Sequence, residues 1–177
     1  MDRFPAAPWS RLLWVATIFT CVLLGSVGYA AWRVIPHVPS KPAAVLVGTL
    51  VAGTPPLVAL LAVLFVVREF ALEGQALAVR RLLWWTVLPL EGLKSVAIDA
   101  ELIRGSLRVF GNGGLFSITG TFWNRRVGRY RAFITDPSKV VILVTPGRTI
   151  ALSPADPAAF VDRVRALFPG ARVERAS

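Results

Sequence analysis

Four arginines are concentrated within seven positions in the second half of the sequence. They are Arg125, Arg126, Arg129 and Arg131, and Trp123 stands two positions before them. Guanidinium groups bind phosphates and carboxylates through paired hydrogen bonds, and a neighbouring aromatic ring adds apolar contact. The stretch is therefore a candidate binding site for anionic lipid headgroups or for the acidic face of a protein partner. The alternative is a solvated basic turn beside a membrane.

No set of residues suited to catalysis accompanies these arginines. The carboxylates are scattered, no histidine follows Arg68, and the run from Gly111 to Gly114 lacks the lysine and Ser/Thr of a phosphate-binding loop. The single histidine, His37, has no cysteine or carboxylate near it in the sequence, so it reads as a loop residue and not as a metal ligand. We therefore expect a protein that is not an enzyme and that uses no cofactor or metal.

Two adjacent tryptophans, Trp84 and Trp85, follow Leu82 and Leu83 in an unbroken apolar run. If the run is a strand, alternation turns one indole into the core and the other outward. The outward indole is a candidate interface with the bilayer, with the end of a membrane helix or with a partner chain. An exposed indole on this strand also predicts that the isolated domain self-associates. A core position beneath a C-terminal helix is the alternative.

Two uncharged apolar segments precede Arg68, at Leu12 to Ala31 and at Ala43 to Val67. At a rise of about 1.5 Å per residue, each is long enough to cross a hydrocarbon core of about 30 Å. The second segment follows the first so closely that a helical hairpin is favoured over a cleaved signal peptide. Pro55 and Pro56 are expected to kink the second helix. Residues 1–67 are thus predicted to be an N-terminal flank and two transmembrane helices.

Basic residues near the helix ends predict the orientation of this hairpin. Five lie on the side of the termini and two in the connecting segment: Arg3, Arg11, Arg68, Arg80 and Arg81, against Arg33 and Lys41. The positive-inside rule then places both termini in the cytoplasm. Three tryptophans at the ends of the first helix suit the headgroup zone: Trp9, Trp14 and Trp32.

The net charge of +10 is concentrated in the part of the chain that follows the apolar segments. From Arg68 onward there are 16 basic and nine acidic side chains, a net charge of +7. This charge favours an anionic partner, and the nearest one is the bilayer. Only the charge suggests a nucleic-acid ligand, and without a recognised reading motif none is expected.

Short apolar runs separated by turn signals predict a mostly β domain over residues 68–168. The expected strands are 70–72, 76–82, 83–88, 93–98, 130–135, 140–145 and 149–152. Glu73 and Gly74 are expected to turn the first hairpin, and residues 146–148 the last.

After the last of these strands, a helical period begins. Apolar residues recur at spacings of three and four: Phe160, Val161, Val164, Leu167 and Phe168. Ser153 is the expected N-cap, with Pro154 at the first helical position, and Pro169 with Gly170 ends the helix. Residues 169–177 are expected to be a flexible tail.

Three stretches of sequence resemble the bacterial pleckstrin-homology-like (PH) domain family, which often follows membrane helices. They are LEGQALAVRRLLWWTVLPLEGLKSV, FGNGGLFSITGTFWNRRVGRYRAFITDP and KVVILVTPGRTIALSPADPAAFVDRVRAL, together spanning residues 69–168. The shared features are the glycines 111, 113 and 114, the spacing of glycines 120 and 128, and the start of the helix at Ser153. The resemblance implies six or seven antiparallel strands, forming a partly open barrel or sandwich, with a C-terminal amphipathic helix. This scaffold hosts many unrelated binding roles.

Two functions are compatible with these features. The first is a membrane-anchored, non-enzymatic binding module in the inner membrane, presenting a cytoplasmic PH-like domain to a protein partner and to anionic lipid headgroups. The second is a structural or accessory subunit that assembles with membrane proteins, or with its own copies, through the transmembrane helices. Partner capture with the helices exchanged for unrelated ones separates the two.

Overall fold

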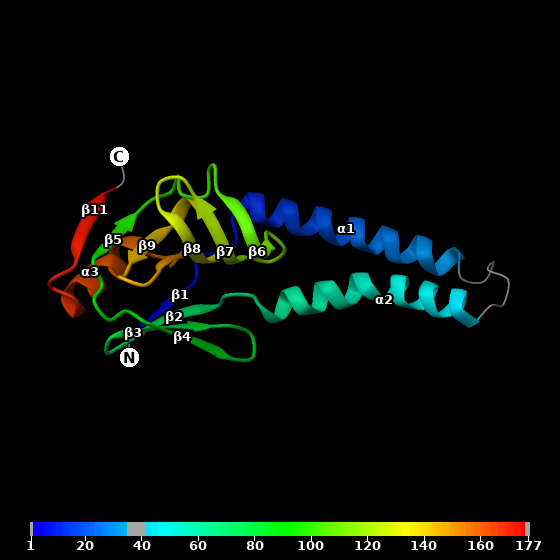
Figure 1. Ribbon diagram of the computed structural model, residues 1–177, viewed down its shortest axis with the longest axis horizontal. Coiled ribbons are helices and arrows are strands. Elements are labelled where there is room, and N and C mark those ends of the chain that lie inside the picture. Colours follow the sequence, from blue (N-terminus) through cyan, green and yellow to red (C-terminus); the bar gives the residue numbers. More distant parts are fainter. Residues whose placement is uncertain (1, 35–41, 176–177) are drawn as a thin grey trace.

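Two long helices extend side by side from one end of a β domain in the computed structural model, which describes residues 2–34 and 42–175 (Figure 1). Helix α1 spans Arg11–Val34 and helix α2 spans Pro42–Leu64. Both are long and apolar enough to cross a membrane, judged by length and composition. The connecting segment, with His37 and Lys41, lies outside the described residues.

The helices approach each other closely where Gly28 of α1 faces the middle of α2. A side chain at Gly28 would stand 3.6 Å from the Ala52 carbonyl oxygen and 3.7 Å from Pro55 Cγ. Helix α2 continues through Pro55 and Pro56, and Thr54 donates its hydroxyl hydrogen to the Leu50 carbonyl at 2.7 Å. Small residues at such crossings are typical of helices that associate within membranes.

The first sheet has four antiparallel strands in the order β1-β2-β3-β4. They are β1 (Asp2–Pro5), β2 (Glu69–Glu73), β3 (Ala76–Arg80) and β4 (Trp85–Pro89). The predicted first hairpin is confirmed, with Gly74 at a φ of 55° in its turn. Strand β1 was not expected: the N-terminal flank pairs with β2, and Phe4 packs edge-to-face on Phe160 at 5.1 Å.

The second sheet has seven strands in the order β11-β5-β9-β10-β8-β7-β6. Its strands are β5 (Ser95–Ile98), β6 (Leu107–Gly113), β7 (Ile118–Asn124), β8 (Gly128–Ile134), β9 (Val141–Val144), β10 (Thr149–Leu152) and β11 (Arg172–Arg175). A short 3-10 turn, η2 (Pro137–Lys139), joins β8 to β9. The pairs β8–β10 and β5–β11 are parallel and the others antiparallel.

The predicted tail and the predicted third strand both need correction. Residues 172–175 form β11 and pair with β5, because the chain turns back after α3 and meets an unpaired sheet edge. The expected strand 83–88 begins only at Trp85, since residues 81–84 make the turn between β3 and β4. Strands β6 and β7 were not predicted either, and they raise the number of strands above the six or seven expected.

Helix α3 spans Pro157–Leu167 and begins later than predicted. Asp156 is its N-cap and accepts a hydrogen bond from the Ala159 N–H at 3.0 Å, with Pro157 at the first helical position. Ser153 instead accepts a hydrogen bond from the Thr135 N–H at 2.8 Å with its buried hydroxyl. The sequence has two candidate capping pairs, Ser153-Pro154 and Asp156-Pro157. The helix begins at the second pair, because the Ser153 hydroxyl is already buried in its contact with Thr135.

Two apolar cores lie on opposite faces of the seven-stranded sheet. One fills the space between the two sheets and α3, and includes Phe70, Phe133 and Phe160. The other includes Phe122, Tyr130 and Leu102, and the start of α1 packs into it through Leu13, together with Trp9 just before the helix. The first turns of α1 are thus part of the core of the β domain, which couples the domain to the helix pair.

Candidate functional site

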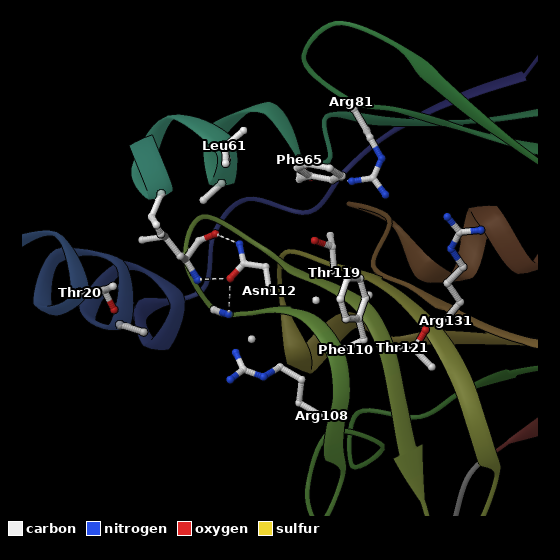
Figure 2. A pocket seen from close by; sticks show the side chains of 18 residues that line it. Thr20, Leu61, Phe65, Arg81, Arg108, Phe110, Asn112, Thr119, Thr121 and Arg131 are labelled. Atoms are coloured by element: carbon white, nitrogen blue, oxygen red, sulfur yellow. Dashed lines mark hydrogen bonds between the residues drawn. The ribbon is translucent and has the colours of Figure 1, made fainter. Parts of the chain in front are cut away.

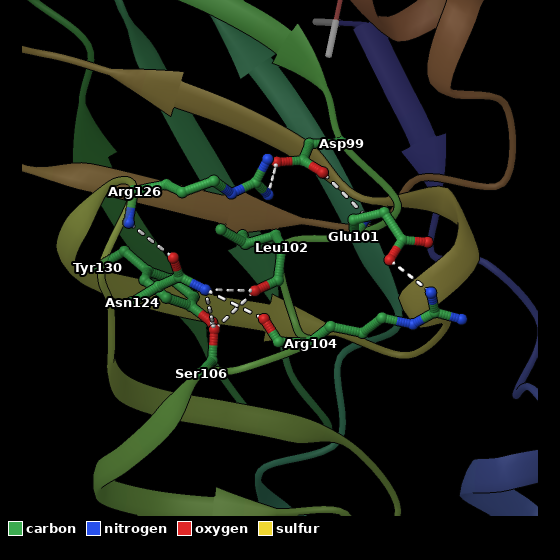
Figure 3. A network of polar contacts seen from close by, with 8 residues as sticks. All are labelled: Asp99, Glu101, Leu102, Arg104, Ser106, Asn124, Arg126 and Tyr130. Carbon is green, nitrogen blue, oxygen red and sulfur yellow. Dashed lines mark hydrogen bonds and ion pairs between the residues drawn. The ribbon is translucent and has the colours of Figure 1, made fainter. Parts of the chain in front are cut away.

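A hairpin of β7 and β8 carries the arginine-rich stretch, and a buried side chain holds its turn. Asn124, the last residue of β7, accepts a hydrogen bond from the Arg126 N–H at 2.8 Å. Its amide nitrogen donates to the Leu102 carbonyl and the Ser106 hydroxyl, both at 3.0 Å, and to the Arg104 carbonyl at 3.3 Å (Figure 3). The turn is fixed to the 99–106 segment.

Tyr130 and Arg126 extend this polar network. The Tyr130 hydroxyl donates to Ser106 Oγ at 2.9 Å, and burial raises the pKa of the phenol while this hydrogen bond opposes the rise. The Arg126 guanidinium forms an ion pair with Asp99 at 2.6 Å, and the Asp99 side chain is only 6% exposed. Arg126 is therefore occupied within the fold.

The other candidate residues of the hairpin divide between two places. Trp123 pairs with Arg129 across the strands, so both project from one face, and Trp123 is 40% exposed. Arg125 stands exposed in the turn. Arg131 pairs with Thr121 and lies over the Phe133 ring at 5.2 Å, where it lines a cavity. The structure thus separates the five residues that the sequence grouped.

The β7–β8 turn lies at the end of its strands that is away from the helices (Figure 1). At the near end, Thr17 of α1 accepts a hydrogen bond from the Phe116 N–H at 3.0 Å and donates to the Gly114 carbonyl at 3.3 Å. Strand β7 then runs from Ile118 to Asn124, which is about 20 Å at 3.3 Å per residue. Arg125 and Arg126 are carried away from the helices by that length.

The prediction that one indole of the tryptophan pair enters the core is wrong. Trp84 is 37% exposed and Trp85 is 38% exposed, because the chain turns at residues 81–84 and breaks the alternation. The Trp84 ring packs edge-to-face on Phe65, just after the end of α2, at 5.2 Å. The Trp85 ring lies under the Arg80 guanidinium at 5.7 Å.

A cavity of about 760 Å³ lies where the helix pair meets the open end of the second sheet (Figure 2). Helix residues form one wall, among them Thr20 of α1 and Leu61 of α2. Strands β6, β7 and β8 form the opposite wall, which carries Arg108 and Arg131, and Arg81 enters from the β3–β4 turn. Of the cavity residues, the sequence singled out Gly111, Gly113, Gly114, Gly120 and Arg131.

Two features of the β6–β7 hairpin shape this cavity. Gly111 and Gly120 face each other across the strands with φ of 111° and 136°. A side chain at Gly111 would stand 2.4 Å from the Thr119 carbonyl oxygen, so the close approach requires glycine. Asn112 accepts hydrogen bonds from the Gly114 and Leu115 N–H groups at 3.2 and 2.9 Å and donates to the Leu115 carbonyl.

Arg81 is the most buried charge in the cavity wall, at 5% exposed. It donates to the Phe65 carbonyl at 3.1 Å and to Thr86 Oγ1 at 3.2 Å. Its guanidinium lies 5.4 Å from the centroid of the Phe133 ring, beside which Arg131 also lies. Burial, followed by repulsion from Arg131, lowers the pKa of Arg81. The side chain still remains cationic at neutral pH.

No carboxylate of the described residues forms an ion pair with Arg81, Arg108 or Arg131. By contrast, Arg80 forms an ion pair with Glu69 at 3.2 Å. The two neighbouring arginines therefore differ completely in environment. The cavity is a concave basic site with an apolar wall, and within the described residues no group of metal-ligating side chains accompanies it.

A comparison with protein-family models matches residues 68–167, more than half of the chain, to the family described as Bacterial PH domain. The chain belongs to the bacterial PH domain family. The match covers β2 to α3, so the PH domain is the part that carries both the arginine hairpin and the sheet wall of the cavity. Comparisons with curated proteins and with solved structures gave no match. The expected resemblance and the PH-like fold are confirmed, and PH-like domains are generally binding modules without catalytic activity.

Proposed function

We propose that this protein is a membrane-anchored, non-enzymatic binding module with a cytoplasmic PH domain. One observation carries the proposal: the PH domain is joined to two apolar helices by direct packing and not by a linker. Leu13 lies in the domain core, and Thr17 bonds to the β6–β7 loop. A domain held in this way has a fixed height and orientation over the bilayer once the helices are inserted.

The exposed apolar surface of the helices supports insertion. Large side chains such as Phe19, Leu46 and Leu60 are exposed, at 59–68%. In water such a surface favours aggregation, whereas in a bilayer it faces lipid. Trp32, at the far end of α1, and Trp84, beside Phe65, then lie near opposite interfaces, where indole rings are favoured.

We assign the distal face of the β7–β8 hairpin to a protein partner. Arg125, Arg129 and Trp123 are exposed there, and tryptophan and arginine are enriched among the residues that dominate binding energy at interfaces. By strand length they lie at least about 16 Å from the β6–β7 end of the sheet that contacts α1, which exceeds the Debye length of about 8 Å at physiological salt. This separation favours an acidic protein surface over lipid headgroups as their target.

Partner capture from solubilised native membranes tests the module. In the test chain, residues 22–57 are exchanged for an unrelated helical hairpin, so that residues 2–21 and 58–175 keep the docking contacts. Retention of the same partners is the expected result, with their loss on Arg125→Gln/Arg129→Gln substitution. Loss of every partner on exchange of the hairpin would instead favour an accessory subunit that assembles through its helices.

Reporter fusions test the orientation. We expect a cytoplasmic signal from a fusion at Ser177 and a signal on the other side of the membrane from a fusion at Pro39, as the positive-inside count predicts. An external signal from the Ser177 fusion would contradict the proposed topology.

A further inference from the structure

The cavity combines two chemically different walls at one height. Its helix wall is apolar, with Val58, Leu61 and Ala62 in the last turns of α2. Its sheet wall carries the arginines and threonine hydroxyls (Figure 2). If α1 and α2 cross a bilayer, the apolar wall lies on the lipid side and the polar wall on the water side. An occupant that satisfies both walls must be amphiphilic.

The polar wall holds more hydrogen-bond donors than the protein uses. The Arg108 and Arg131 guanidiniums donate no hydrogen bond to a described residue, and the hydroxyls of Thr119 and Thr121 are likewise unused. The buried Arg81 keeps only neutral acceptors, the Phe65 carbonyl and Thr86. The buried Arg81 guanidinium and the Arg131 guanidinium both lie beside the Phe133 ring, and neither forms an ion pair with a described carboxylate. Such an arrangement is unfavourable alone and is stabilised by an anion.

We infer that this cavity binds a single anionic membrane lipid, with its phosphate held by Arg81 and Arg131 and its first acyl segments packed against α2. The inference rests on the proposed insertion of the helices. A volume of about 760 Å³ suits a headgroup with the start of its chains. A free phosphate would leave the apolar wall uncovered, and a neutral lipid would leave the arginines unneutralised.

The proposed lipid contact lies apart from the β7–β8 turn, so the arginines of the turn provide a matched control. Arg108 and Arg131 line the cavity, whereas Arg125 and Arg129 do not. All four are exposed and none forms an ion pair with a described residue, so substitution by glutamine removes the same charge from each pair without removing a structural bond.

Native mass spectrometry of the full chain, released from nanodiscs that mix phosphatidylglycerol with phosphatidylcholine, measures the bound lipid. Wild type is expected to retain one phosphatidylglycerol in preference to phosphatidylcholine. Arg108→Gln/Arg131→Gln should reduce that retention at least about tenfold, since one charge-assisted contact with the phosphate and a second cation of the cavity wall are lost, while Arg125→Gln/Arg129→Gln should leave it unchanged. A thermal melt of each variant confirms folding.

Equal retention by the two double variants, or equal retention of the two lipids by wild type, would overturn the inference. A competition experiment separates a lipid from a soluble anion as the ligand. Dihexanoyl phosphatidylglycerol should displace the bound lipid, whereas equal displacement by inorganic phosphate at the same concentration would show that the site binds a soluble anion and would overturn the lipid assignment. Alkaline extraction of membranes keeps the two proposals apart. A chain washed from the membrane refutes the anchored module, whereas an integral chain with equal retention refutes only the lipid site.

Discussion

The β7–β8 turn and the cavity are both rich in arginine, but their arginines differ in what surrounds them. In the turn, Arg126 forms an ion pair with the buried Asp99, and Asn124 holds the backbone. In the cavity, Arg108 and Arg131 form no ion pair with any described residue. Arg125 and Arg129, beside Arg126, likewise form none. Charge clustering alone therefore does not separate an arginine used within the fold from one left available to a ligand.

The largest expected effect in this comparison comes from the turn. Asn124→Ala removes the acceptor of the Arg126 N–H and the donor to Leu102, Arg104 and Ser106. We expect the free energy of unfolding to fall by about 3 kcal/mol, because several buried polar groups lose their partners. Denaturant unfolding of the full chain in neutral micelles, followed by tryptophan fluorescence, measures it. A change no larger than that of Arg125→Gln would show that the network does not hold the turn.

A smaller effect separates a paired arginine from an unpaired one. Arg126→Gln leaves Asp99 buried without its cation, and should lower the free energy of unfolding by about 1 kcal/mol, a value limited by the half exposure of Arg126. Arg131→Gln should raise stability slightly in neutral micelles, because it removes repulsion with Arg81. The two melting temperatures should thus move in opposite directions. Shifts of the same sign and size would remove the distinction between the two regions.

The smallest expected effect is a fall in the free energy of unfolding at alkaline pH. The pKa of Tyr130 is raised in the folded state, so folding favours the protonated phenol. This contribution is present below the ordinary tyrosine pKa of about 10 and is lost as the pH rises through the folded pKa. Absorbance titration at alkaline pH should show a tyrosine that ionises late. Its disappearance in Tyr130→Phe would assign it, and the absence of any late-ionising component in wild type would contradict the burial of Tyr130.

The sequence predicted the elements that depend on local pattern. The two apolar helices, the β2–β3 and β9–β10 hairpins and the stripe of α3 each repeat at a period that a short window contains. Strands β1 and β11, of four residues each, were missed, because they exist only through pairing with β2 and β5. Their own residues carry too little alternation to indicate a strand. Strands β6 and β7, of seven residues each, were missed as well, because glycines and a register shift interrupt their pattern.

The cavity could not be predicted because its arginines look alike in the sequence. Arg80 and Arg81 are adjacent, yet Arg80 forms an ion pair with Glu69 and Arg81 turns into the cavity. The turn at residues 81–84 makes this difference, and it also exposes both tryptophans that alternation had divided. Arg108 had no basic neighbour to draw attention to it. Charge clustering found Arg131 but grouped it with residues nearer the turn of the hairpin.

The most direct test of the account is the melting temperature of the full chain in neutral micelles as dihexanoyl phosphatidylglycerol is added. A ligand that binds only the folded protein raises its stability with concentration. Wild type and Arg125→Gln/Arg129→Gln should show the same rise, and Arg108→Gln/Arg131→Gln should show little, with dihexanoyl phosphatidylcholine without effect on any of them. An equal rise in both double variants would contradict the claim that the unpaired arginines of the cavity bind the anion.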